Sequence, residues 1–334
     1  MARLAVATAM SAALVVLSVS VGAVPIPPGD VLAVVAHHLL GTTAVPDPIT
    51  DQIVWDIRLP RALLGVLVGG SLAVAGTALQ AMVRNPLADP YVLGVSSGAS
   101  LAAVAVLLSG VAVGGAPVQI AAFLGALAAL LAVSLLAGAR GTLPPLRLVL
   151  AGVALSYALS GTTSYLIFAS DDPQAAQSVL FWLLGSLGPA RWESLGVPAA
   201  ALVLGCGWLL ARAPALDAMV LGDEPAATLG FAAGRLRREL LVVSSLVTGV
   251  VVAVSGGIGF VGLMIPHLVR LLTGPTHARL LPLATVVGAG YLVAVDVVAR
   301  TVNAPVEVPL GVVTSVLGAP VFLWLLRSRM RADR

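Results

Sequence analysis

Residues 213–239 read APALDAMVLGDEPAATLGFAAGRLRRE, and they form a polar interruption near the middle of an almost continuously apolar chain. Within this stretch, Asp223 is placed to cap a short helix, Pro225 suits its first turn, and Gly230 can adopt the left-handed conformation that ends it. An isolated helix of about two turns is marginal in water, because helix nucleation is costly. We therefore expect this helix to pack on the rest of the chain or on a second protein.

The composition of the 334-residue chain is that of a polytopic membrane protein. Hydrophobic residues make up 59% of it and charged residues 10%, with a mean hydropathy of +1.05, whereas soluble domains carry roughly a quarter charged residues. The length leaves room for about ten spans of roughly 20 residues. The single cysteine, Cys206, excludes an intrachain disulfide and a cysteine-rich metal site.

All 18 basic residues are arginine, and none is lysine. A P-loop uses a lysine to hold a nucleotide phosphate, so the sequence lacks this motif. If ATP drives the protein, another chain must bind it. The arginines are spread through short connectors instead of forming one patch, which argues against a nucleic-acid partner.

Ten apolar segments are candidate membrane spans. They are Leu4–Val24, Ala62–Val83, Tyr91–Val113, Pro117–Ala139, Arg147–Ala169, Trp192–Arg212, Leu240–Ser255, Ile258–Leu272, Leu281–Thr301 and Val308–Leu326. Residues 25–61 are expected to form a loop with an interfacial helix at Val31–Leu40, and a short amphipathic piece is expected around Gln177–Leu187. The first segment favours a retained span, although its basic start and small-residue end also fit a cleaved signal peptide.

The arginines orient these spans. If the N-terminus lies inside, fourteen of the 18 arginines fall on that side, and Arg58, Arg61, Arg191 and Arg300 fall on the other. Such a bias marks the arginine-rich side as the cytoplasm. The predicted protein is therefore a single all-α transmembrane domain over residues 1–334 in the cell membrane, with both termini and the loop at 213–239 in the cytoplasm.

Two other functions find little support in the motifs. Gly94–Gly98 matches the Gly-x-Ser-x-Gly pattern of a serine nucleophile, but a strand-to-helix turn and a histidine partner are not indicated, so close helix packing explains it better. An intramembrane serine protease stays a remote alternative. Apart from Asp296, the spans lack the buried acidic residues that often relay ions, which weakens an ion-coupled secondary transporter. No two histidines have the His-Glu-x-x-His metal spacing.

Several short motifs occur in the order seen in one family of permeases. They are Arg58-Leu59-Pro60-Arg61; Arg84–Pro90 followed by Leu93–Ala99; Leu221-Gly222 with Ala226 and Leu229-Gly230; Gly257–Leu263 with Pro266-His267; Asp296 with Arg300; and Pro309–Thr314 with Gly318–Pro320. Over nearly its whole length the chain thus resembles the FecCD-type permease subunits of ABC importers for iron-siderophores, haem and vitamin B12. The resemblance implies ten transmembrane helices per subunit.

The resemblance also implies partners and cargo. A second permease subunit would complete the pathway, as a homodimer or a pair of homologues. Two ATPase subunits would bind on the cytoplasmic side and hold ATP and Mg, and a substrate-binding protein would dock outside. The chain itself is then a transport protein and not an enzyme, with no cofactor or metal of its own. A ferric siderophore is the first expectation for the cargo, and cobalamin and haem stay open.

Three groups of residues are expected to carry the function. The ATPase-coupling group is Leu221, Gly222, Asp223, Ala226, Leu229 and Gly230; the gate and pathway group is Gly76, Gln80, Asn85, Pro86 and Leu87; the docking group for the binding protein is Arg58, Arg61 and Arg300. Arginine suits docking because its planar fork bonds a carboxylate through two donors. In the alternative interpretation, Arg58 and Arg61 only flank a helix start, and Arg300 pairs with Asp296.

Overall fold

The computed structural model describes residues 2–42, 47–109, 118–138 and 144–332, and these residues form helices and connectors without a strand. The helices are α1 (Ala2–Ser20), α2 (Pro28–Leu40), α3 (Pro48–Gln52), the π-helical turn η1 (Ile53–Arg58), α4 (Leu59–Val83), the 3₁₀ turn η2 (Pro90–Leu93), α5 (Val95–Ser109), α6 (Val118–Ala137), α7 (Pro145–Phe168), α8 (Pro173–Leu184), the 3₁₀ turn η4 (Trp192–Ser194), α9 (Gly196–Ala211), α10 (Ala213–Leu221), α11 (Asp223–Thr228), α12 (Ala233–Ser255), α13 (Val261–Thr273), α14 (His277–Thr301) and α15 (Leu310–Ala332). The all-α prediction is confirmed.

The ten predicted spans each coincide with a helix. Within the described residues, seven helical segments are long and apolar enough to cross a membrane. The other three spans correspond to the shorter apolar helices α5, α13 and the first part of α15. The predicted span ends at Val113, Pro117 and Ala139 lie outside the described residues.

The prediction of a loop over residues 25–61 is wrong for the second half of that range. Residues 48–61 continue the second span outward as one helical segment, Pro48–Val83. Asp47 caps its start, because its carboxylate accepts hydrogen bonds from the backbone N–H groups of Ile49 at 3.0 Å and Thr50 at 3.1 Å. The wide π turn at η1 then leads into Pro60, which sits in the first turn of α4 where its missing N–H costs little.

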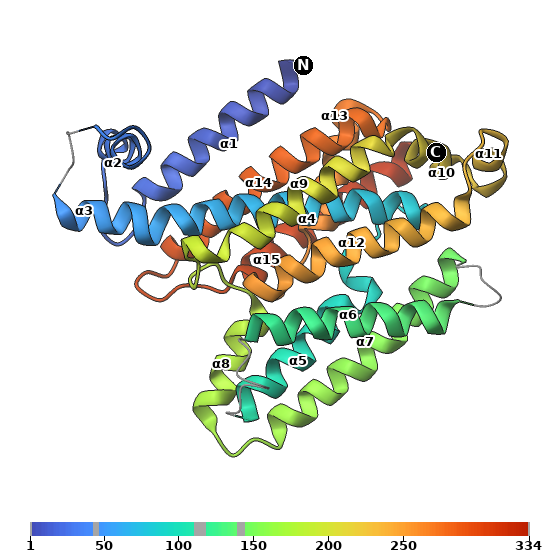
Figure 1. Cartoon of the computed structure of the whole chain (residues 1–334), viewed down its shortest axis with the longest axis horizontal. Helices are drawn as coiled ribbons and strands as arrows, with labels where there is room; N and C mark the ends of the chain where they lie inside the picture. Colours follow the sequence, from blue (N-terminus) through green and yellow to red (C-terminus); the bar gives the residue numbers. More distant parts are fainter. Residues whose placement is uncertain (1, 43–46, 110–117, 139–143, 333–334) are drawn as a thin grey trace.

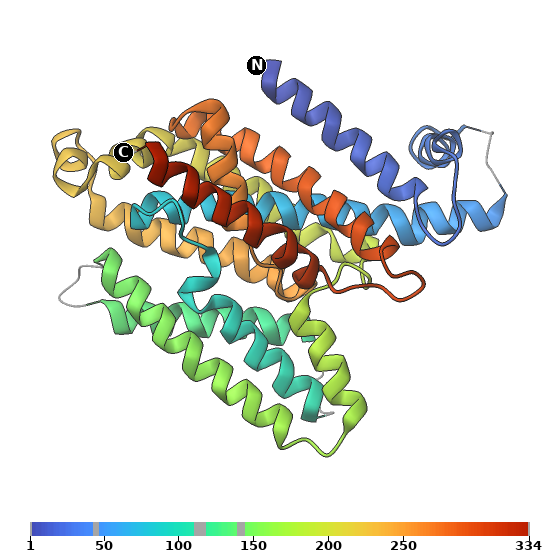
Figure 2. The ribbon, with the colours of Figure 1, turned by 180° about the vertical axis from the view of Figure 1, so that it is seen from behind.

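Helix α4 is the axis of the bundle. Most of its residues are buried, and it packs against α14, α12, α13 and α9, as Figures 1 and 2 show from opposite sides. Glycines bring the backbones into contact: a Cβ atom at Gly69 would fall on the carbonyl oxygen of Gly288 in α14, and one at Gly76 would fall on that of Gly262 in α13. Small residues allow this close approach between membrane helices.

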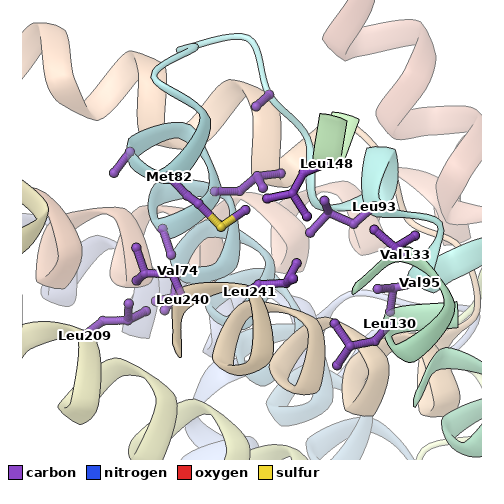
Figure 3. Packing of buried hydrophobic residues seen from close by; sticks show 14 of the residues in the cluster. Val74, Met82, Leu93, Val95, Leu130, Val133, Leu148, Leu209, Leu240 and Leu241 are labelled. Carbon is purple, nitrogen blue, oxygen red and sulfur yellow. The ribbon is translucent and has the colours of Figure 1, made fainter. Parts of the chain in front are cut away.

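A second group of helices, α5 to α8, lies beside this central bundle in Figure 1. Helices α5 and α6 meet through Gly98 and Gly125, each of which would place a Cβ atom on the backbone of the other. Figure 3 shows the apolar packing that joins the two groups, where Met82 of α4 and Leu241 of α12 lie near Leu93, Val95 and Leu130. Gly98 therefore serves packing, as the sequence indicated for this motif.

The two ends of the bundle differ in what they carry. Helices α10 and α11 project at one end, and the C-terminus lies near them; α2, α3 and the connector between α14 and α15 lie at the opposite end (Figures 1 and 2). Arg3 donates to the carbonyl oxygen of Leu272 near the end of α13, which holds the start of α1 beside the turn before α14. By the distribution of arginines, we refer to the α10–α11 end as the inner end.

Candidate functional site

We refer to residues 213–239 as the inner loop. It contains two short helices, α10 and α11, joined at Gly222. Gly222 ends α10 and precedes α11 with a φ of 127°, a conformation that favours glycine. The expected cap at Asp223 is wrong, since Gly222 occupies the N-cap position and Asp223 is the first helical residue. Asp223 instead accepts a hydrogen bond from the Arg237 guanidinium at 2.7 Å, tying α11 to α12. Gly230 has a φ of 85°, as the sequence predicts.

The loop buries one face and leaves another exposed. Ala226 is fully buried against Ala218 and Ala233, so α11 packs on its own neighbours. Leu221 and Leu229, by contrast, are 68% and 60% exposed. These two leucines lie outside the spans, where a soluble partner can reach them. The coupling residues thus divide into a packed support and an open apolar tip.

A hydrogen-bonded contact joins α10 of this loop to the start of α14. Asp217 of α10 accepts a hydrogen bond from the backbone N–H of His277 at 2.9 Å, and the same oxygen lies 2.6 Å from the His277 ring Nδ1. His277 is the first residue of α14 and is buried. Asp217 therefore caps α14 from the loop, although neither residue was singled out from the sequence. Their separation of 60 residues gave no local signal.

The turn after α4 is irregular and locally bonded. Arg84 ends α4 in the left-handed conformation, with a φ of 54°. The Asn85 side-chain oxygen accepts a hydrogen bond from the Leu87 N–H at 2.9 Å, and Pro86 lies between them. Asn85 is exposed, and Leu87 is half-buried.

The other two gate residues lie deeper, on the face of α4 that meets α13. Gly76 touches Gly262 directly. The Gln80 amide donates to the carbonyl oxygen of Leu263 at 3.1 Å, and its oxygen accepts from Arg270 at 3.2 Å. The structure thus separates the predicted gate group into an exposed turn and a buried helix contact.

Sequence reasoning missed a clamp on the break between α12 and α13. The Tyr91 hydroxyl accepts a hydrogen bond from the Ile258 N–H and donates one to the Ile258 carbonyl, both at 2.9 Å. Asp89 caps the turn that carries Tyr91, by accepting from its N–H at 2.9 Å. Phe260, just beyond, has a φ of 68°, which is strained for a bulky residue. The glycines at 256, 257 and 259 were the available signal, because backbone that leaves a helix inside a membrane protein needs other partners.

At the outer end, Arg58 is buried and bonded to backbone. Its guanidinium donates to the carbonyl oxygens of Val19 at 2.8 Å, Ser20 at 3.2 Å and Val24 at 2.6 Å, around the end of α1. Three carbonyl acceptors satisfy its donors without any carboxylate. Arg58 therefore holds the start of α4 to the end of α1.

Arg61 and Arg300 share the buried carboxylate of Asp296. Arg61 reaches it at 2.9 Å and Arg300 at 3.0 Å, while Asp296 is 1% exposed. Arg300 also donates to the carbonyl oxygens of Ser18 and Val21, each at 3.0 Å. The pairing of Arg300 with Asp296, the alternative interpretation of the sequence, is present in the structure. We refer to Arg61, Asp296, Arg300 and Glu307 as the outer charge cluster.

Glu307 completes this cluster from the connector after α14. Both of its oxygens accept from the Arg61 guanidinium at 2.8 Å. The hydrogen bond with Arg61 lowers the pKa of the Glu307 carboxyl below its usual range. Glu307 is half exposed, unlike Asp296. The docking role of the three arginines stays a prediction, and the arginines are held by internal acceptors in this structure.

The described residues contain no group of three or more histidine, cysteine, aspartate or glutamate side chains placed to hold a metal ion.

His37 and His38 lie in α2, where His38 pairs with Asp51 at 3.1 Å and stacks on Trp55 with ring centroids 4.0 Å apart. Trp192 in turn donates to the Trp55 carbonyl at 2.9 Å. These contacts fasten α2 and η4 to the outer part of the long second span.

Comparison with known proteins matches the chain to permeases. Residues 10–328 match the model of the FecCD transport family. The chain is 45% identical to the cobalamin import system permease BtuC of Halobacterium salinarum, over 84% of this chain and 75% of that one, and 42% identical to the hemin transport system permease HmuU of Yersinia pestis, over 85% and 87%. A solved metal-chelate-type ABC transporter in an inward-facing conformation superposes with a TM-score of 0.85 at 32% identity, covering 97% of this chain and 98% of that one. The chain therefore belongs to the FecCD transport family and is a membrane permease of the ABC-transporter type.

Proposed function

We propose that this permease serves an ATP-driven importer that carries a ferric siderophore across the cytoplasmic membrane. The observation that carries the importer role is the inner loop, a structured elbow whose apolar tip is exposed in a chain without a P-loop. The relatives named above carry cobalamin and haem, which with ferric siderophores share the chemistry of a chelated metal. Cobalamin and haem are accordingly the competing cargoes.

The proposed assembly has four further chains. A second copy of the permease forms a homodimer, two ATPase subunits bind ATP and Mg at the inner end, and one binding protein docks at the outer end. Both permease termini lie in the cytoplasm. The packing of Arg3 beside the turn before α14 supports this placement, because that turn is at the same end as the loop that would meet the ATPase.

Coupling would run from the ATPase to α14. The exposed Leu221 and Leu229 give the ATPase an apolar surface to hold, and Gly222 sets the angle between α10 and α11. Asp217 then links α10 to the first turn of α14. Because α14 packs along α4, a displacement of the loop reaches the centre of the bundle. Each ligand, whether ATP or cargo, shifts the equilibrium between the inward-open and outward-open states only as far as its affinities for the two states differ.

The turn at Asn85–Leu87 is the proposed inner gate. Its support is an irregular, partly exposed backbone next to the buried end of α4, since such backbone persists near a bilayer only where protein covers it or water lines it. Gly76 and Gln80 then act through the α4–α13 contact and do not line the gate themselves. Cysteine at Leu87, in a Cys206→Ala background, is expected to react with a soluble thiol reagent at a nucleotide-dependent rate. Equal rates in all states contradict gating.

Docking of the binding protein at Arg58, Arg61 and Arg300 requires a change at the outer charge cluster. Glu307 is its exposed member, so an incoming carboxylate can replace it on Arg61 with little desolvation. Arg58 and Arg300 are enclosed and would support the surface from below. Exchange at Arg61 would make association sensitive to salt. Reversal of Arg61 to Glu is expected to slow association at low salt, and an unchanged rate rejects the docking role.

The decisive experiment is uptake into proteoliposomes that contain the permease with its ATPase, with the binding protein supplied outside. A panel of ferric siderophores, cobalamin and haemin is compared at equal concentration, with and without ATP. ATP-dependent uptake of a ferric siderophore supports the proposal, and preference for cobalamin or haemin replaces the cargo while keeping the importer. A Gly222→Leu variant is the coupling control: we expect normal insertion and loss of ATP-dependent uptake, because leucine is strained at a φ of 127°.

A further inference from the structure

A basic hollow lies between the end of α9 and the start of α12. Its volume is about 620 Å³, and its lining residues are Trp208, Arg212, Arg235, Arg238, Glu239, Val242 and Val243. A second hollow of about 330 Å³ shares Arg212, Arg235 and Glu239 with it and extends toward Gly230. Neither hollow includes the exposed leucines of the inner loop. The first hollow contains no residue of the ATPase-coupling group, whereas the second borders that group at Gly230.

The charges in the hollow do not balance. Three arginines face one carboxylate, that of Glu239, which leaves two positive charges in excess. Arg235 donates to Glu239 at 2.9 Å, and Arg212 lies 3.6 Å from its other oxygen. The Arg212 guanidinium also lies over the Trp208 ring, 5.3 Å from its centroid. Arg212 and Arg235 are nevertheless 46% and 76% exposed, so their remaining donors are open to an anion.

The walls of the hollow are apolar on the side that leads into the membrane. Val242 and Val243 lie one turn beyond Arg238 and Glu239 along α12, and Trp208 lies one turn before Arg212 along α9. Both helices are long and apolar enough to cross a bilayer. Val242 is exposed, whereas Trp208 and Val243 are partly buried against the core. Arginines at the mouth and apolar side chains below them match a molecule with an anionic head and a hydrocarbon tail.

We propose that this hollow binds an anionic phospholipid, with the phosphate on Arg212 and Arg235 and an acyl chain along Trp208 and Val242. A soluble anion would use the arginines and leave the apolar wall uncovered. A soluble protein partner would be kept from that wall by the bilayer itself. The inference concerns the membrane around the permease and does not depend on which cargo it carries.

The test measures lipid retention by the purified full-length permease. Delipidated protein is incubated with cardiolipin, phosphatidylglycerol or phosphatidylcholine in detergent, and bound lipid is counted by native mass spectrometry. We expect the anionic lipids to be retained at least tenfold better than phosphatidylcholine, and Arg212→Gln with Arg235→Gln to remove that preference. Glu239→Gln should strengthen retention several-fold, because the competing carboxylate is gone. Arg147→Gln, an exposed arginine on α7 outside the hollow, is the matched control and should behave as wild type.

The opposite signs expected for the arginine and glutamate variants keep the test informative even if the double variant unfolds. Equal retention of all three lipids overturns the proposal, and so does a weaker or unchanged retention in Glu239→Gln. Full displacement of the anionic lipid by millimolar inorganic phosphate would assign the hollow to a free anion instead. Normal lipid retention together with lost ATPase binding in the double variant would assign it to the ATPase.

Discussion

Charged side chains have different kinds of partners at the inner and outer ends of the bundle. At the outer end, Asp296 and Glu307 together neutralise Arg61 and Arg300 inside the chain, and Arg58 is satisfied by carbonyl oxygens. At the inner end, Asp217 and Asp223 each hold one neighbouring helix, and the inner loop that carries them exposes Leu221 and Leu229. The buried charges of the outer end are therefore paired within one subunit, whereas the inner loop carries exposed leucines that a partner can cover. The predictions below test this difference.

The largest effect is expected from Asp296→Asn. Removing this carboxylate leaves two enclosed guanidinium groups without their shared counter-charge, and breaking a buried pair in this way costs about 3–5 kcal/mol. Glu307 and the carbonyls of α1 retain part of the bonding, so we expect a loss of about 3 kcal/mol in the free energy of unfolding. Thermal unfolding in detergent measures it. Asp51→Asn, at a half-buried carboxylate of the same end, should change stability far less.

Asp217→Ala should damage coupling more than stability. The substitution removes the acceptor that caps α14 from the loop, while the packing of Ala226 and the Asp223–Arg237 pair keep α11 in place. We expect ATP-dependent uptake to fall about tenfold, with ATPase activity and assembly retained. Uptake per ATP hydrolysed is the readout. Glu239→Ala, which removes another carboxylate of the same loop region, should preserve that ratio, and an equal fall in both variants would show that the Asp217 contact is not special.

Leu221→Ser and Leu229→Ser should weaken ATPase association without unfolding the permease. Burying a leucine in an interface contributes about 1.5–3 kcal/mol, so each change is expected to raise the Kd by about tenfold or more. Titration of the ATPase onto immobilised permease measures the Kd. Val302→Ser, at an exposed valine of the outer end, is the matched control. If it weakens ATPase binding equally, the inner leucines are not the contact.

The smallest effect concerns Glu307 and pH. Its pKa is lowered by the hydrogen bond with Arg61, so its contribution to stability is fully present above about 4.5 and is lost as the pH falls through the lowered value. The carboxyl is half exposed, so the contribution is about 0.2–1 kcal/mol. Glu307→Gln should lower the stability of the permease at pH 7 by that amount, and the difference from wild type should shrink below pH 4.5. A difference that grows on acidification contradicts the assigned pair.

The sequence predicted the features that depend on local pattern. Hydropathy located ten spans, and the i,i+4 spacing of Asp296 and Arg300 anticipated their pair. It placed the start of the second span wrongly, because Pro60 and the acidic residues before it look like a loop, and a π turn accommodates them instead. It also took Asp223 for a cap, although Gly222 before it fits that position.

The remaining contacts join residues far apart in the chain. Arg61 meets Asp296 across 235 residues, and Tyr91 meets Ile258 across 167. Such pairs have no local periodicity or spacing, since tertiary packing alone brings them together. The roles of the coupling, gate and docking residues came from a resemblance to a family, and they stay predictions until the proposed experiments are made.

The backbone contacts of α4 provide a frame of reference for spectroscopy. Because Gly69 and Gly76 place α4 directly on the carbonyl groups of Gly288 and Gly262, the α4–α13–α14 unit has no side-chain layer there that could rearrange. Spin labels at the exposed Leu271 of α13 and Val298 of α14 are therefore expected to keep one separation in every nucleotide state. A third label on the inner loop would then report the motion of that loop relative to this fixed pair of positions.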